Sequence, residues 1–91
     1  MNFTWDPAKA VKNEKKHGVD FHDTASVLED PLSTTFPDPA HSSAERRFLT
    51  IGVSSRQRLL VVSHTEEGET VRIISARTAE RPERRFYEEG P

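Results

Sequence analysis

Three short stretches rich in β-branched and aliphatic residues constrain the fold of this chain more than any other feature. They are Arg47–Val53, Arg58–Thr65 and Thr70–Ala76, and only short polar segments separate them. Stretches of this composition are typical of β-strands, and short polar connections between them are typical of hairpins. The sequence therefore predicts an antiparallel meander of strands in the second half of the chain.

The rest of the chain predicts helices on either side of this meander. Asp6 and Pro7 form a helix start, because aspartate caps free N–H groups and proline suits the first helical position. In chain order we expect a strand at Phe3–Trp5, helices at Pro7–His17 and about Phe21–Leu28, a strand near Thr34–Phe36 and a helix at about Ala79–Glu89. We predict a single domain over residues 1–91 with an α+β fold, an antiparallel β-sheet meander packed by two N-terminal helices, with a C-terminal helix.

The composition excludes several ways of stabilising or equipping so short a chain. Its 91 residues include no cysteine, so neither a disulfide bond nor a thiolate metal site can form. The histidines show neither the i, i+4 spacing of a zinc-binding helix nor an H-E-x-x-H motif, so we predict no metal ion and no cofactor. No stretch has the pattern of a signal peptide or a membrane span, which predicts a cytoplasmic protein without membrane contact.

The charges are segregated along the sequence, although the net charge is only -2. All four lysines lie between Lys9 and Lys16, and all nine arginines lie from Arg46 onward. Residues 20–45 carry six acidic residues and no lysine or arginine. Because phosphate contacts dominate affinity for nucleic acids, the net charge argues against a bulk nucleic-acid binder, whereas the two basic regions permit an RNA ligand.

The two hairpins predict which distant side chains share a face of the sheet, since directly opposed residues point the same way. We expect Val53 to lie opposite Arg58 in the first hairpin, and Thr65 to lie opposite Glu69 in the second. The residues that these registers bring to one end of one face are Arg47, His64 and Arg72. The apolar residues assigned to that same face include Leu60 and Val62. The opposite face, which we expect the N-terminal helices to cover, includes Leu59, Val61 and Ile73.

The predicted cluster suits cleavage of RNA without a metal ion. That reaction needs a base for the 2′-hydroxyl proton, a cation for the charge that develops on the phosphate, and an acid for the leaving oxygen. Histidine suits the base because its pKa lies near neutrality, and arginine holds phosphate oxygens in a bidentate fork. The candidate catalytic residues are His64, Arg72, Arg77 and Tyr87. The candidate contacts to RNA phosphates are Arg47, Arg58 and Lys16.

Each of these candidates also has a structural interpretation. A histidine at the position of His64, near a strand end, is more often a half-exposed polar residue than a catalyst. Arg72 and Arg77 are placed to pair with acidic residues at the start of the C-terminal helix, and Tyr87 is placed to pack from an amphipathic helix. The residues alone leave both interpretations open.

An ordered set of motifs resembles the BrnT family of toxins. The C-terminal signature is Arg72-Ile73-Ile74-Ser75-Ala76-Arg77, followed by Glu83-Arg84 and Tyr87. The matching motifs before it are Phe3-Thr4-Trp5-Asp6, Asn13, Lys16-His17-Gly18-Val19, Phe21, Arg46-Arg47 and Ile51-Gly52. The resemblance implies a RelE-like fold and a ribonuclease that inhibits translation. It also implies neutralisation by a BrnA-like antitoxin with a ribbon-helix-helix part, through which alone the complex would bind operator DNA.

A second hypothesis is that the chain binds the antitoxin and does not cleave RNA. In it the arginine-rich face docks an acidic segment of the antitoxin, and the chain acts as a non-catalytic co-repressor, a silent toxin. Growth arrest on expression and cleavage of RNA distinguish the two hypotheses, because tight binding of an antitoxin is expected in both.

Overall fold

A computed structural model describes residues 1–41 and 45–90, in which two N-terminal helices follow the first strand and one helix follows the last. The elements in chain order are β1 (Asn2–Thr4), α1 (Pro7–His17), α2 (Phe21–Val27), β2 (Thr34–Pro37), the 3-10 helix η1 (Pro39–His41), β3 (Arg47–Val53), β4 (Leu59–Glu67), β5 (Thr70–Thr78) and α3 (Arg81–Glu89). Because helices pack onto a largely antiparallel sheet, the predicted α+β class is confirmed.

The strands form one sheet in the order β1-β5-β4-β3-β2. Strands β2 to β5 pair antiparallel with their neighbours, as the meander predicts. β1 pairs with β5 in the parallel direction, opposite Thr70, Val71 and Arg72, so the sheet is mixed and not wholly antiparallel. β1 thereby occupies part of the edge that the meander leaves open on β5.

The first helix begins and ends where the sequence predicts. The Asp6 carboxylate accepts a hydrogen bond from the N–H of Ala8 at 2.8 Å, and Pro7 follows as the first helical residue. Gly18 ends α1 with a left-handed φ of 68°, which glycine adopts without steric cost. No helix in the described part of the chain is long and apolar enough to cross a membrane.

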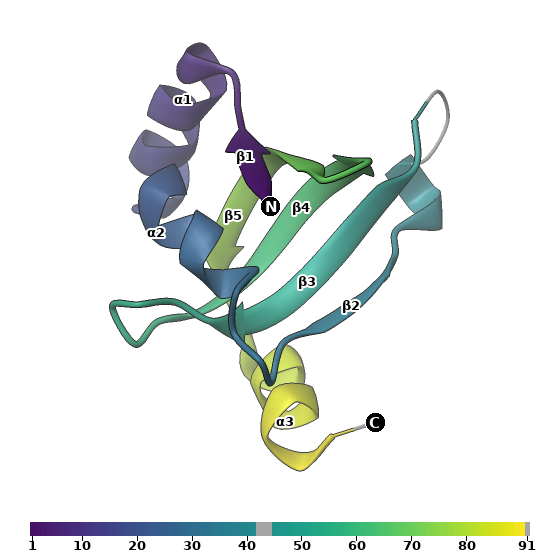
Figure 1. Cartoon of the computed structure of the whole chain (residues 1–91). Coiled ribbons are helices and arrows are strands. Elements are labelled where there is room, and N and C mark those ends of the chain that lie inside the picture. Colours follow the sequence, from purple (N-terminus) through teal and green to yellow (C-terminus); the bar gives the residue numbers. More distant parts are fainter. Residues whose placement is uncertain (42–44, 91) are drawn as a thin grey trace.

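One face of the sheet is covered by α1 and α2, which lie together on the same side of it (Figure 1). Leu60 and Val62 of β4 point toward these helices and have no exposed surface. Burying a side chain of this size contributes roughly 1.5–3 kcal/mol. We call this side the closed face. Its buried apolar residues are Val19, Phe21, Val27, Leu60, Val62, Ile73 and Ala76.

Asn13 joins α1 to the part of the β5 edge that β1 does not reach. Its side-chain nitrogen donates to the carbonyl of Ala76 at 2.9 Å, and its side-chain oxygen accepts from the N–H of Ala76 at 3.0 Å. The nitrogen also donates to the carbonyl of Val19 at 3.2 Å. Asn13 is buried, so its amide satisfies backbone groups that would otherwise lie away from water without a strand partner.

Among the described residues, α3 lies at one end of the opposite side of the sheet (Figure 1). Phe86 and Tyr87 of α3 pack there against a small buried cluster. α3 itself has no buried residue. We call this side the open face. The buried residues of its cluster are Ile51, Leu59 and Val61.

Both predicted hairpin registers are wrong. In the first hairpin Val53 lies opposite Leu59 and not Arg58, because the connection is one residue longer and Gln57 adopts a positive φ of 63°. In the second hairpin Glu67 lies opposite Thr70, because β4 continues through the glutamates and the turn begins at Gly68. The side-chain period of a strand is two, so a shift of one residue exchanges the faces.

A bulge in β5 adds a further shift. Ser63 lies opposite Ser75 and His64 opposite Ile73, so Ile74 is an extra residue between two pairs. The combined effect reverses the predicted faces of β4. Leu60 and Val62 lie on the closed face, under the N-terminal helices. Leu59 and Val61, which were predicted to lie under those helices, lie on the open face.

Candidate functional site

Arg47 and Arg72 lie in one row of side chains across the open face. Thr65 is paired with Arg47 on one side and with Arg72 on the other, and Thr4 lies opposite Arg72 on β1. Thr65 shares a face with Val61 because the two are an even number of residues apart in β4. Adjacent strands are about 4.8 Å apart, so the Cα atoms of the two arginines are separated by about 10 Å. We call these four residues the arginine row.

The arginine row lines a hollow of about 410 Å³. Lys9 of α1 adds a third cation to its wall, and Thr70 adds a further hydroxyl. Glu45 and Glu67 also line it. Guanidinium, ammonium and hydroxyl groups are the donors that hold phosphate oxygens, and the carboxylates are proton acceptors. The hollow therefore combines the groups that bind a phosphate with groups that can take a proton.

His64 does not lie in this hollow, because the register shift places it on the closed face. Its side chain is 0% exposed. Its Nε2 is 2.7 Å from the Thr50 hydroxyl, which in turn lies 2.6 Å from the hydroxyl of Thr35. Phe48 stacks on the ring at 5.9 Å between centroids. The predicted cluster of Arg47, His64 and Arg72 therefore keeps its two arginines and has Thr65 where the histidine was expected.

Burial lowers the pKa of His64 below its usual value of 6.5, although the nearby Glu66 carboxylate and a backbone hydrogen bond at Thr65 act in the opposite direction. Its Nδ1 atom is buried and has no hydrogen-bond partner among the described residues. A charged imidazolium without a partner is costly in such surroundings. His64 is thus a neutral core residue in this conformation.

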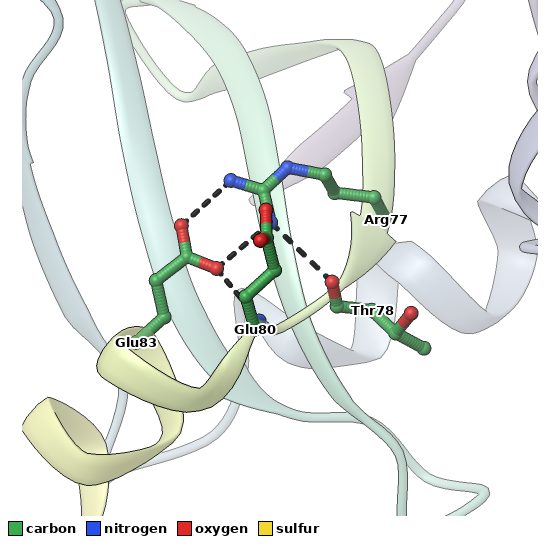
Figure 2. Close-up of polar contacts among 4 residues, drawn as sticks. All are labelled: Arg77, Thr78, Glu80 and Glu83. Carbon is green, nitrogen blue, oxygen red and sulfur yellow. Dashed lines mark hydrogen bonds and ion pairs between the residues drawn. The ribbon is translucent and has the colours of Figure 1, made fainter.

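Arg77 lies on the open face and is held by two carboxylates near the start of α3 (Figure 2). Its guanidinium donates to both oxygens of Glu83, at 2.8 and 2.6 Å, and forms an ion pair with Glu80 at 3.6 Å. The bidentate hydrogen bonds raise the pKa of Arg77 and lower that of Glu83. This arrangement ties the first turn of α3 to β5.

Tyr87 anchors the last turn of α3. Its phenol donates to the Asp30 carboxylate at 2.6 Å, and this hydrogen bond raises the pKa of Tyr87 to about 12. Burial acts to raise the pKa of Asp30, but hydrogen bonds from Tyr87 and from the N–H groups of Val53 and Leu32 outweigh it, so that pKa lies below its usual value. Tyr87 therefore holds its proton firmly against a carboxylate.

The other predicted phosphate contacts lie outside the hollow. Arg58 donates to the carbonyl of Gly18 at 3.0 Å, at the end of α1. Lys16 is exposed on α1 and lines a separate shallow depression together with Lys12 and Ser75. Of the seven predicted site residues, the structure brings only Arg47 and Arg72 together in the hollow.

Sequence reasoning missed Thr65 and Lys9. Thr65 becomes visible only with the correct register, because it is the residue that pairs with both arginines. Lys9 carried a usable signal: with Lys12 and Lys16 it recurs at intervals of three and four residues, which places all three on one side of a helix. Within residues 1–41 and 45–90, no group of three His, Cys, Asp or Glu side chains is arranged to hold a metal ion.

Comparison with known proteins assigns the family. The sequence model described as the ribonuclease toxin BrnT of a type II toxin-antitoxin system matches residues 5–83. The crystal structure of the Brucella abortus ribonuclease toxin BrnT superposes with a TM-score of 0.69 and 30% sequence identity, covering 89% of this chain and 99% of that one. Comparison with curated protein sequences gives no match. The chain therefore belongs to the BrnT family of ribonuclease toxins of type II toxin-antitoxin systems.

Proposed function

We propose that the chain is a metal-independent endoribonuclease whose active site is the hollow around the arginine row. The observation that carries the proposal is the pairing of Arg47 and Arg72 with the same residue, Thr65, which places both arginines on one face in the lining of one hollow. Two guanidinium groups on long side chains can bind one phosphate, or two successive phosphates of an RNA strand, through bidentate hydrogen bonds. Lys9 adds positive charge where negative charge develops during cleavage.

The family description supplies the setting of this activity, a toxin paired with an antitoxin. We infer that RNA cleavage inhibits translation, and that a BrnA-like antitoxin with a ribbon-helix-helix part neutralises the toxin. An RNA substrate and an operator are both cytoplasmic, so the protein would act in that compartment. Operator DNA would be contacted only through the antitoxin.

In this proposal Arg77 and Tyr87 act by positioning α3, and His64 acts from the core, because none of the three reaches the hollow. The same facts favour a second candidate function, a silent toxin that binds the antitoxin as a co-repressor without cleaving RNA. Three of the four side chains predicted to be catalytic are occupied by other protein groups, Glu83, Asp30 and Thr50.

Cleavage of RNA by the purified chain in the presence of a metal chelator tests the proposal. Arg72→Ala should reduce the cleavage rate by about 100-fold or more, the range found when a group that stabilises transition-state charge is removed. Arg72→Lys should restore only part of the rate, because lysine keeps the charge and loses the bidentate fork. Arg58→Ala is the matched control, since it removes the same charge outside the hollow.

Two outcomes contradict the proposal. If the wild-type chain cleaves no RNA and causes no growth arrest while binding its antitoxin tightly, the co-repressor function replaces the enzyme. If the wild-type chain cleaves RNA and Arg72→Ala and Arg58→Ala are equally active, the active site lies elsewhere.

A further inference from the structure

Cleavage at the arginine row requires a group that removes the 2′-hydroxyl proton, and the histidines do not provide it. His64 is enclosed on the closed face. His17 lines the depression beside Lys12 and Lys16, and His22 of α2 stacks edge-on against Trp5 at 4.9 Å. No histidine side chain that the structure describes lines the hollow.

Tyr87 is an equally poor proton acceptor. Its phenol is protonated and already donates to the Asp30 carboxylate at the far end of α3. The arginines of the row remain charged and cannot accept a proton. Among the described residues of the hollow, the carboxylates of Glu67 and Glu45 are left as proton acceptors.

Glu67 is the better placed of the two. It lies two residues beyond Thr65 in β4, so it points to the same face at a distance of about 7 Å along the strand. Its partner across the ladder is Thr70, which is itself two residues from Arg72. β4 is the strand between the two that carry Arg47 and Arg72. Glu67 therefore lies on the same face as Arg47 and Arg72, on the strand between theirs, whereas Glu45 precedes β3.

We propose that Glu67 is the general base of the ribonuclease reaction. The inference rests on the proposed function and adds the residue that starts the chemistry. The Glu67 carboxylate takes the proton of the 2′-hydroxyl, the 2′-oxygen forms a bond to phosphorus, and the bond from phosphorus to the 5′-oxygen breaks. Water protonates the leaving 5′-oxygen, and the hydroxide so formed takes the proton from the Glu67 carboxyl group, which restores the carboxylate. The products carry a 2′,3′-cyclic phosphate and a 5′-hydroxyl, so atoms and charge balance without a metal or cofactor.

The neighbouring glutamate provides a matched control. Glu66 lies next to Glu67 in the same strand and is exposed, but it is paired with Val71 and points to the other face. Glu66→Gln and Glu67→Gln therefore make the same change in net charge beside the same turn. Only the second change is made inside the hollow.

The experiment measures single-turnover cleavage of a single-stranded RNA, RNA affinity and product ends for the full chain. Glu67→Gln should lower the cleavage rate by about 100-fold or more at unchanged or tighter RNA binding, since a positioned base contributes 10²–10⁴-fold. Glu67→Asp should retain part of the rate, because aspartate keeps the carboxylate on a side chain shorter by one methylene group.

The outcomes separate this inference from the proposed function. Cleavage by the wild type and undiminished cleavage by Glu67→Gln would overturn the base assignment and leave the active site in place. A larger loss in Glu45→Gln or Glu66→Gln than in Glu67→Gln would also overturn it. A wild-type chain that cleaves no RNA would overturn the proposed function and the assignment together.

Discussion

The two faces of the sheet are built from the same strands and are covered very differently. On the closed face, α1 and α2 cover Leu60 and Val62 completely. On the open face, α3 covers the cluster around Leu59 at one end and leaves the arginine row at the other end accessible. Alternate residues of β4 thus belong to a sealed core and to a surface that can meet a ligand.

This difference separates the requirements of folding from those of binding. A buried apolar face stabilises the domain, so the hollow can be lined by two arginines, a lysine and two carboxylates without losing the fold. α3 is held to the open face by polar contacts at Arg77 and Tyr87, in addition to the packing of Phe86 and Tyr87. The closed face should therefore respond to packing changes, and the open face to changes in charge and hydrogen bonding.

The largest expected effect is on packing of the closed face. Leu60→Ala should lower the free energy of unfolding by about 3 kcal/mol, because the side chain is fully enclosed and its loss leaves a cavity. Leu49→Ala, on the half-buried open face, should cost less than about half as much. Urea denaturation of both variants measures the difference. Equal losses would show that the two faces contribute alike and would contradict the comparison.

A second expected effect concerns pH and His64. Its pKa is lowered in the folded chain, so on acidification the unfolded chain binds the proton first. The contribution of the neutral imidazole to the free energy of unfolding is complete above the pKa of histidine in the unfolded chain, near 6.5. It declines as the pH falls from there toward the lower pKa of His64 in the folded chain. Between pH 7.5 and 5.5 the wild type should lose up to about 1.4 kcal/mol from this group.

His64→Gln provides the reference for that measurement, because glutamine can still bond to the Thr50 hydroxyl and does not titrate. The two proteins differ only at residue 64, so the difference between the two denaturation curves isolates His64. Parallel loss of stability in both proteins between these pH values would show that His64 is not sealed from solvent.

A smaller effect is expected for the ion pair that ties α3 to β5. The double-mutant cycle of Arg77→Ala and Glu83→Ala should give a coupling of about 1 kcal/mol, a value reduced by solvent because the arginine side chain is 36% exposed. The pKa of Glu83 is lowered, so this coupling should be present above about pH 4.5 and disappear as pH falls below it. Hydrogen exchange of α3 amides should quicken in each single variant.

Much of this fold is predictable from local signals in the sequence. The Asp6-Pro7 start and the Gly18 stop define α1, and the β-branched stretches define β3 to β5. α3 begins at Arg81, so Pro82 lies in the first turn, where a missing N–H removes no hydrogen bond. These features depend on residues close in sequence, which is why they could be identified without the structure.

The site was less predictable because it depends on register. Three features shift the pairing of the strands: the extra residue at Gln57, the late turn at Gly68 and the bulge at Ile74. The composition of the strands predicts none of them. Their combined effect moved His64 into the core and left Arg47 and Arg72 in one row. Arg47 and Arg72 were predicted to lie together from strand registers that are wrong. Glu67 was missed because it falls in the polar segment between two predicted strands.

The smallest expected effect tests whether Tyr87 belongs to the chemistry or to the attachment of α3. Tyr87→Phe removes the phenol that donates to Asp30 and keeps the ring that packs on the open face. Asp30 retains its hydrogen bonds from Val53 and Leu32, so the free energy of unfolding should fall by only about 0.5 kcal/mol. RNA cleavage should stay within about threefold of the wild type, because a positioned acid contributes 10²-fold or more. A loss of that larger size at unchanged stability would return Tyr87 to the active site and require α3 to move when RNA binds.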